Sequence, residues 1–171
     1  MAHEVQIGSF TAGAGHRPFL IAGPCVIESE ALVLETASRI AEIAQSLGMP
    51  CIFKSSFDKA NRTSINSYRG PGLEKGLVVL QKVKDQLGLP ILTDVHTEEQ
   101  ATEAGKIVDV LQIPAFLCRQ TDLLIAAADN HTDTAAIRKE SARSSRHGCH
   151  GPSFRLREVR AWREEGLRIR N

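Results

Sequence analysis

Residues 51–63 read Cys51-Ile-Phe-Lys-Ser-Ser-Phe-Asp-Lys-Ala-Asn-Arg-Thr63, a short apolar run followed at once by basic and hydrogen-bonding residues. A short apolar run bounded by polar residues is typical of a buried strand. The segment therefore predicts a strand over 51–55 that delivers lysine, arginine, asparagine and threonine side chains to one end of a sheet. Such a set suits two small anionic ligands, phosphates or carboxylates, and makes an enzyme the leading hypothesis.

The same pattern recurs along the first 128 residues. Short apolar runs predict strands over 19–23, 51–55, 91–95 and 107–113, and apolar residues at helical spacing predict helices over 31–47, 73–87, 97–104 and 121–128. Glycine and proline end two of these helices, at Gly48 and Pro50 and again at Gly88 and Pro90. Strands that alternate with helices imply βαβ units and a parallel α/β sheet.

Polar residues gather where the predicted strands end. The four strands contribute, in chain order, Cys25 and Glu28, Lys54 and Lys59, Asp94 and His96, and Gln112 and Arg119. Ligands of parallel sheets bind at the carboxyl ends of the strands, whether the sheet is open or closed as a barrel. Four strands that feed polar groups to one face indicate a functional site more strongly than any one residue does.

Composition bounds the class of protein. The 171 residues are enough for one domain with a hydrophobic core, and the net charge of +1 gives no reason to expect a nucleic acid or an anionic membrane as partner. No apolar run approaches the length of a membrane span, and residues 1–15 lack a signal-peptide pattern. The four cysteines are widely spaced, which fits a reducing cytoplasm better than a disulfide scaffold.

The basic candidates each have a second interpretation. Lys54 and Lys59 are either point-charge ligands for an anion or solvated surface lysines. Their clustering in one loop with other polar residues, Asn61, Arg62, Thr63 and Arg69, favours ligand binding. Arg119 can grip an oxyanion with two parallel donors, or it can pair with Asp122.

The remaining candidates are an acid–base pair and a thiol. Alternation along an extended segment puts Asp94 and His96 on one face, either for acid–base work or as a buried hydrogen-bonded pair. Cys25 could be a nucleophile, a metal ligand or a small core residue. Cys51 and Cys118 lie in apolar surroundings and are interpreted as core residues.

Five motifs, in order over residues 18–128, resemble the 3-deoxy-D-manno-octulosonate 8-phosphate synthase (KDO8P synthase) family. They are Ile21-Ala-Gly-Pro-Cys-Val-Ile-Glu-Ser29, Phe53-Lys-Ser-Ser-Phe-Asp-Lys-Ala-Asn-Arg62, Tyr68-Arg-Gly-Pro-Gly-Leu73, Thr93-Asp-Val-His96 and Ile113-Pro-Ala-Phe-Leu-Cys-Arg-Gln-Thr-Asp122. The resemblance implies a TIM-type (β/α)8 barrel, of which this chain carries about the first four βα units. It also implies a cytoplasmic homotetramer that condenses phosphoenolpyruvate with D-arabinose 5-phosphate and water, releases phosphate, and feeds lipopolysaccharide or plant cell-wall synthesis.

The resemblance also implies a role for each matching residue. Lys54 and Lys59 would hold phosphoenolpyruvate, and the arabinose 5-phosphate would be bound by Asn61, Arg62 and Thr63, the last two on its phosphate. Phosphoenolpyruvate would further contact Gln112, Ala115 and Phe116, and the arabinose phosphate of a neighbouring subunit would be reached by Arg119. Asp94 and His96 would sit near the reacting carbons. Cys25 would be a ligand of a divalent Zn, Fe or Mn type ion, because the metal-dependent class of the family has cysteine there.

The resemblance ends at about residue 128. The family continues with a fifth strand and three more βα units that supply further metal ligands, and residues 129–171 do not resemble them. Residues 138–171 hold nine arginines and one lysine, and 155–170 predict a short basic helix. We therefore expect a frameshifted or irregular tail outside the core. Four strands cannot close an eight-stranded barrel, so poor folding and little synthase activity are expected.

Two alternatives stay open at this stage. One is a related condensation of the DAHP synthase type, with erythrose 4-phosphate as acceptor. The other is a non-catalytic half-barrel that binds phosphates or pairs with a partner.

Overall fold

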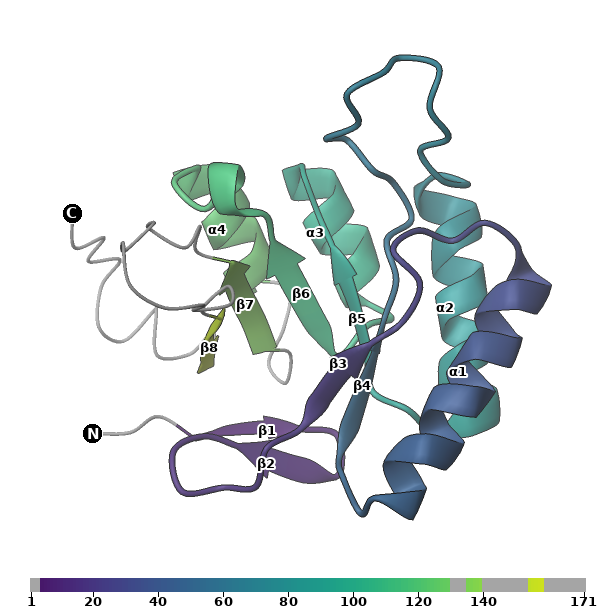
Figure 1. Ribbon diagram of the computed structural model, residues 1–171. Helices are drawn as coiled ribbons and strands as arrows, with labels where there is room; N and C mark the ends of the chain where they lie inside the picture. The colour runs from purple at the N-terminus through teal and green to yellow at the C-terminus, as the bar shows by residue number, and fades with distance from the viewer. Residues whose placement is uncertain (1–3, 130–134, 140–153, 159–171) are drawn as a thin grey trace, which may run out of the picture.

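The computed structural model describes residues 4–129, 135–139 and 154–158. Its elements, in chain order, are β1 (Val5–Ile7), β2 (Phe10–Ala12), β3 (Leu20–Ala22), α1 (Glu30–Ser46), β4 (Cys51–Lys54), α2 (Leu73–Leu87), β5 (Ile91–Asp94), α3 (Glu98–Gly105), β6 (Val110–Ile113), the 3-10 helix η1 (Ala115–Leu117), α4 (Thr121–Asp129), β7 (Ala135–Lys139) and β8 (Phe154–Glu158). The predicted alternation of strands and helices from residue 19 to residue 128 is confirmed (Figure 1).

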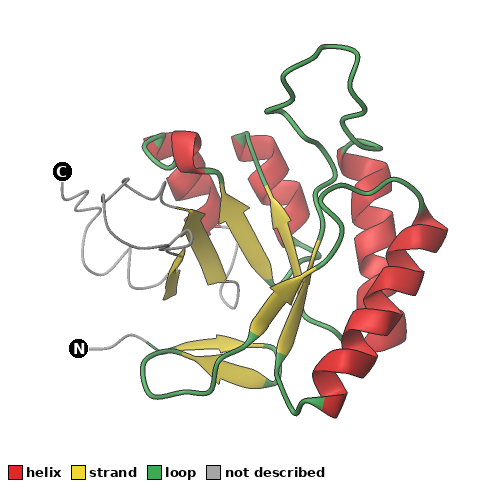
Figure 2. Cartoon of the chain, in the orientation of Figure 1, coloured by secondary structure: helices red, strands yellow, loops and turns green. Residues whose placement is uncertain are grey.

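The main sheet has the order β3-β4-β5-β6-β7-β8. Its first five strands run parallel, and β8 pairs antiparallel to β7. Figure 2 shows the helices along one side of this sheet. The described strands thus form an open sheet with the successive βα units of a TIM-type barrel, of which about the first four are present.

The two faces of the strands have different apolar partners. Residues of one face, including Phe53, Ile91 and Leu111, pack with the helices in the larger core. Residues of the other face, including Ile52 and Leu92, pack against the β1–β2 hairpin. The hairpin lies at the amino ends of the strands (Figure 1). It covers that half of the sheet face that points away from the helices, here called the inner face, and leaves the carboxyl half of this face uncovered by the hairpin.

The hairpin was not predicted from the sequence. Each of its strands has three residues, too few for a period of two to stand out. Gly8, at the turn between them, has φ 52°, which glycine adopts more easily than other residues do. Val5 and Ile7 point into the smaller core, at 2% and 1% exposed.

Helix ends follow local chemistry. The side chains of Ser29 and Thr97 accept hydrogen bonds from Leu32 N and Gln100 N, as N-caps do. Gly88 ends α2 in the left-handed conformation, so its predicted role is confirmed. None of the helices among the described residues is long and apolar enough to cross a membrane.

The predicted strand over 107–113 was too long, because residues 107–109 close the end of α3. The amides of Ile107 and Val108 donate to the Ala104 carbonyl at 3.0 and 2.9 Å. The Asp109 carboxylate then receives the amide of Ile91 at 2.8 Å and the Lys84 ammonium at 2.9 Å. Asp109 therefore anchors the start of β5 rather than extending β6.

We expected the tail after residue 128 to lie outside the core, and β7 shows that this expectation is wrong for residues 135–139. Strand β7 pairs in parallel with β6 over four residues of register, from Val110 with Ala135 to Ile113 with Arg138. The basic helix predicted from Arg155 is wrong over its first residues, where β8 forms instead. The reason is that pairing with β7 satisfies the backbone of 154–158, which local propensity alone does not foresee. The rest of that predicted helix lies outside the described residues.

Candidate functional site

On the face of the sheet that packs against the hairpin, the side chains of each strand change from apolar to polar toward the carboxyl end. The apolar layer, Ile52, Leu92 and Val110, rests on the hairpin, and the residue two positions further along each strand belongs to a polar layer, Lys54, Asp94 and Gln112. A strand turns every second side chain to the same face, so both layers look inward. The parallel register pairs Asp94 with Gln112 on neighbouring strands. The predicted gathering of these residues at the carboxyl ends of the strands is thus what the fold produces.

Four side chains at this end form one connected polar cluster: Lys54, Ser56, Asp94 and His96. The Lys54 ammonium donates to Ser56 Oγ at 3.2 Å and lies 3.5 Å from Asp94 Oδ1. Ser56 Oγ donates a short hydrogen bond to Asp94 Oδ1. The imidazole Nε2 of His96 lies 3.3 Å from Asp94 Oδ2. Asp94 is therefore the hub, with a partner on each of its oxygens.

Burial and charge shift the pKa values of two cluster members. Burial alone would raise the pKa of Asp94, but the hydrogen bond from His96, the charge of Lys54 and the hydrogen bond from Ser56 outweigh it and lower the pKa. Burial lowers the pKa of Lys54, Asp94 partly offsets this, and the nearby charge of Lys59 lowers it further. The charge of Lys59 acts on both groups: it stabilises the Asp94 carboxylate and opposes the charged form of Lys54.

His96 is oriented by its surroundings. Its backbone amide donates to Gln100 Oε1 at 2.9 Å, and its ring meets the ring of Phe57 edge-on at 6.5 Å. Nδ1 is buried and has no hydrogen-bond partner among the described residues. The predicted placement of Asp94 and His96 on one face is confirmed, and the two form the hydrogen-bonded pair.

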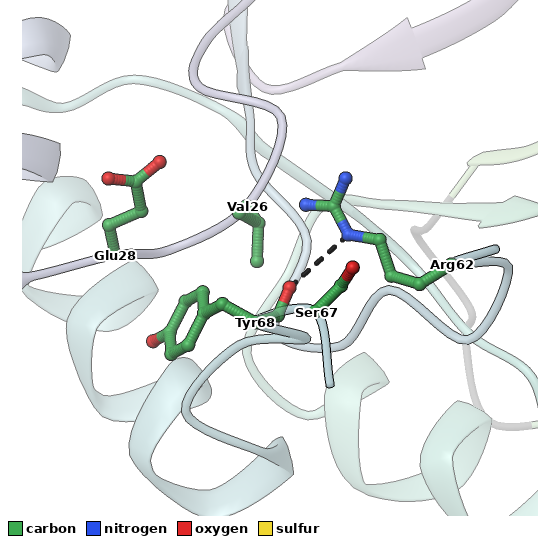
Figure 3. Close-up of a pocket in the computed structure, with 5 residues that line it drawn as sticks. All are labelled: Val26, Glu28, Arg62, Ser67 and Tyr68. Atoms are coloured by element: carbon green, nitrogen blue, oxygen red, sulfur yellow. Dashed lines mark hydrogen bonds between the residues drawn. The ribbon is translucent and has the colours of Figure 1, made fainter. Parts of the chain in front are cut away.

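The loop after β4 projects from the carboxyl end of the sheet (Figure 2). Its residues Asn61, Arg62 and Thr63 are exposed. Arg62 Nε donates to the Tyr68 carbonyl at 3.2 Å, the bond drawn in Figure 3. A shallow hollow of about 490 Å³ is lined by Val26, Glu28, Arg62, Ser67 and Tyr68. The polar cluster does not line this hollow. Arg62 therefore lies on a separate surface at the carboxyl end of the sheet.

Arg69 is not a free cation of this loop. Its Nε and Nη2 donate to the two carboxylate oxygens of Asp58 at 2.8 and 2.6 Å. This two-bond pairing removes it from the group of anion-binding candidates to which its sequence position had assigned it.

The loop after β6 carries the remaining candidates. Ala115 and Phe116 lie on η1, with Phe116 93% exposed, and Arg119 is exposed just beyond it. Gln112 is half-buried in β6. The structure brings Gln112 into the polar layer, and it leaves Phe116 and Arg119 at the surface of the chain.

The predicted core positions of Cys51 and Cys118 are confirmed, whereas the core interpretation of Cys25 is wrong. Cys51 and Cys118 are buried, and burial raises the pKa of the Cys51 thiol. Cys25 is exposed after β3. The described residues contain no group of three or more histidine, cysteine, aspartate or glutamate side chains that could hold a metal ion.

Ser56 is the site residue that sequence reasoning missed. It is fully buried and joins Lys54 to Asp94. The signal was present, because Ser56 stands two residues after Lys54 and so turns to the same face. A serine carries no charge, so the sequence alone does not mark it out beside two lysines.

A parallel α/β sheet with a lysine, a carboxylate and an imidazole gathered at its carboxyl end defines a protein built on (β/α) barrel units with a polar site suited to anionic ligands. Residues 3–134 match the family model of the DAHP synthetase I family. The chain belongs to that family.

Curated relatives support this assignment. The chain is 60% identical over 128 residues to the 2-dehydro-3-deoxyphosphooctonate aldolase of Trichlorobacter lovleyi, a match that covers 75% of this chain and 47% of the relative. It is 62% identical over 126 residues to the protein of that name from Variovorax paradoxus, covering 74% and 44%. It is 57% identical over 129 residues to that of Geotalea daltonii, covering 75% and 47%. The chain spans about half the length of these relatives.

Proposed function

We propose that this chain carries the substrate-binding half of a KDO8P synthase, which condenses phosphoenolpyruvate with D-arabinose 5-phosphate and water and releases phosphate. The observation that carries the proposal is the connected cluster of Lys54, Ser56, Asp94 and His96 at the carboxyl ends of β4 and β5. Relatives named 2-dehydro-3-deoxyphosphooctonate aldolase align over this region, which supports the reaction type.

Phosphoenolpyruvate brings a phosphate and a carboxylate, and the carboxyl end of the sheet offers matching groups. Lys54 and Lys59 supply positive charge in a partly buried position, where charge-assisted hydrogen bonds are strong. Gln112, Ala115 and Phe116 complete the surroundings of this substrate in the proposal. Asp94 is ionised at neutral pH, because its pKa is lowered, so it accepts hydrogen bonds and holds His96 in one orientation rather than acting as a general acid.

The sugar phosphate is assigned to the exposed loop. Arg62 offers a guanidinium to a phosphate, and Asn61 and Thr63 offer neutral donors. Arg119 is exposed, which is compatible with a reach into a neighbouring subunit of a homotetramer. Asp94 and His96 stand nearest the reacting carbons in this arrangement, with the Nε2 of His96 directed to Asp94.

A divalent metal fits the described residues poorly. Cys25 alone offers a soft ligand, and a stable transition-metal site needs at least three protein ligands. We therefore assign no step to a metal, and Cys25 serves as a metal ligand only if ligands come from outside the described residues.

The proposal extends to the state of the chain. A frameshift or unrelated splice after residue 128 would explain the arginine-rich tail, and the nucleotide sequence around codon 129 tests this. A cytoplasmic location is part of the same proposal, with no nucleic acid and no membrane as partner.

Calorimetry and an assay of phosphate release on the whole 171-residue chain test the function. We expect phosphoenolpyruvate to bind the wild-type chain, Lys54→Met to weaken binding roughly tenfold or more, and Lys75→Met on the outer side of α2 to leave it unchanged. We expect little phosphate release with arabinose 5-phosphate, because the sheet is open. No binding by a folded wild-type chain contradicts the substrate assignment, and normal turnover contradicts the incomplete site.

The choice of acceptor discriminates the related condensation. Erythrose 4-phosphate that protects the Arg62 loop from trypsin better than arabinose 5-phosphate would favour a DAHP synthase type of reaction. Clean phosphoenolpyruvate binding with neither sugar phosphate bound would favour a non-catalytic phosphate-binding half-barrel.

A further inference from the structure

The loop between β4 and α2 is pinned at its base by contacts that do not involve its tip. The Arg69 guanidinium donates two hydrogen bonds, of 2.8 and 2.6 Å, to the Asp58 carboxylate. Next to this pair, the Lys59 amide donates to the Arg69 carbonyl at 2.7 Å, and the Gly72 amide donates to the Phe57 carbonyl at 3.1 Å. The two ends of the loop are therefore held side by side.

Close packing leaves this base little freedom. Gly70 has φ 128°, and a Cβ atom there would collide with the carbonyl oxygen of Phe57. On the other side, the Tyr68 hydroxyl donates to the Ile27 carbonyl at 3.0 Å and ties the loop to the segment before α1. The Asp58 side chain is 21% exposed and that of Arg69 is 54% exposed, so the pair stands at the edge of this packed region.

Lys59, a candidate ligand of the anionic substrate, is joined to this base. It follows Asp58 directly, and its amide is bonded to Arg69. Its positive charge lowers the pKa values of both Lys54 and Asp94, so it lies within electrostatic reach of the polar cluster. The pair of Asp58 and Arg69 therefore adjoins the backbone that carries the Lys59 side chain.

We propose that Asp58 and Arg69 form a clasp of positioning residues that sets Lys59 against the polar cluster for binding of the anionic substrate. Arg69 is not itself an anion ligand in this proposal. The inference rests on the proposed function, since the substrate that Lys59 meets is the phosphoenolpyruvate assigned there.

Phosphoenolpyruvate binding to three variants of the whole chain separates the clasp from direct ligation. A clasp predicts that Asp58→Asn and Arg69→Met each weaken binding, by about fivefold, because each removes the ion pair. It also predicts that the charge-swapped double variant, Asp58→Arg with Arg69→Asp, recovers most of the loss. Glu103→Gln, on α3 and in an exposed ion pair with Lys106, is the matched control and should change nothing.

The opposite sign identifies direct ligation. If Arg69 contacts the substrate, Asp58→Asn frees a cation and strengthens or preserves binding, and the charge swap abolishes it. Either result overturns the clasp.

Tryptic cleavage after Arg62, followed by mass spectrometry, is the second readout. A clasp predicts about fivefold faster cleavage in Asp58→Asn than in wild type, and unchanged cleavage in Glu103→Gln. If the folded wild-type chain binds no phosphoenolpyruvate, the proposed function fails by itself. The clasp then fails too if cleavage is unchanged, and stands as a device of the loop if cleavage is faster and the swap restores protection.

Discussion

The apolar layer and the polar layer lie two residues apart on the same three strands, yet one packs in the core and the other faces the candidate site. Ile52, Leu92 and Val110 are at most 1% exposed and pack on the hairpin. Lys54, Asp94 and Gln112 face the open carboxyl end, where Lys54 and Gln112 are half-buried. The difference teaches that one strand can give stability at its amino end and ligand chemistry at its carboxyl end, because alternation keeps both on one face.

Truncation in the apolar layer should have the largest effect on stability. Leu92→Ala removes a side chain that is 1% exposed and leaves a cavity between β5 and the hairpin. We expect a loss of about 3 kcal/mol in the free energy of unfolding, measured in urea. Val78→Ala on α2, where the valine is 56% exposed, should cost far less. Equal losses for the two variants would show that the hairpin does not enclose this layer.

Removal of the charge at the hub should come next. Asp94→Asn takes the counter-charge from Lys54 and a favourable acceptor from His96 and Ser56. We expect a loss of roughly 2 kcal/mol at pH 7, because one partner of a buried pair is left uncompensated.

The pH dependence of that loss gives an independent check. The folded-state pKa of Asp94 is lowered, so its stabilisation is present above the unfolded-state value of about 3.9 and is lost as the pH falls toward the folded-state value. The gap in unfolding free energy between wild type and Asp94→Asn should therefore narrow below about pH 4. A gap that stays constant from pH 7 to pH 3 would contradict the ion pairing of Asp94.

Loss of the bridging hydroxyl should have a smaller effect. Ser56→Ala deletes a fully buried group that bonds both Lys54 and Asp94. We expect roughly 1.5 kcal/mol of destabilisation, since two charged groups each lose a partner. Ser46→Ala, at the exposed end of α1, is the control and should lie within about 0.5 kcal/mol of wild type. A neutral Ser56→Ala variant would mean that the bridge contributes nothing.

Much of this arrangement could be predicted from the sequence, where the signal was local. The placement of Asp94 and His96 on one face followed from alternation, and Thr97 was recognisable as an N-cap. Only tertiary context supplied the rest. Arg69 and Asp58 stand eleven positions apart in one polar loop, and nothing in their spacing distinguishes an ion pair from two free groups.

The strands of the tail show the same limit. Residues 135–139 have no strong strand pattern by themselves, and they are ordered by the parallel partner β6. Pairing of this kind depends on an edge that is already in place, so it cannot be read from a window of a few residues.

The smallest change in stability should come from placing an apolar side chain in the polar layer. Gln112→Leu replaces a half-buried amide at the carboxyl end of β6 with an apolar side chain of similar size. We expect the free energy of unfolding to change by no more than about 0.5 kcal/mol, because the position is neither sealed nor fully solvated. Phosphoenolpyruvate binding should nevertheless weaken by about fivefold, since the ligand loses a polar neighbour. Gln86→Leu, exposed near the end of α2, controls for added surface hydrophobicity. Unchanged phosphoenolpyruvate binding in Gln112→Leu would show that Gln112 does not contact the ligand. The binding residues of the polar layer would then come from β4 and β5 alone.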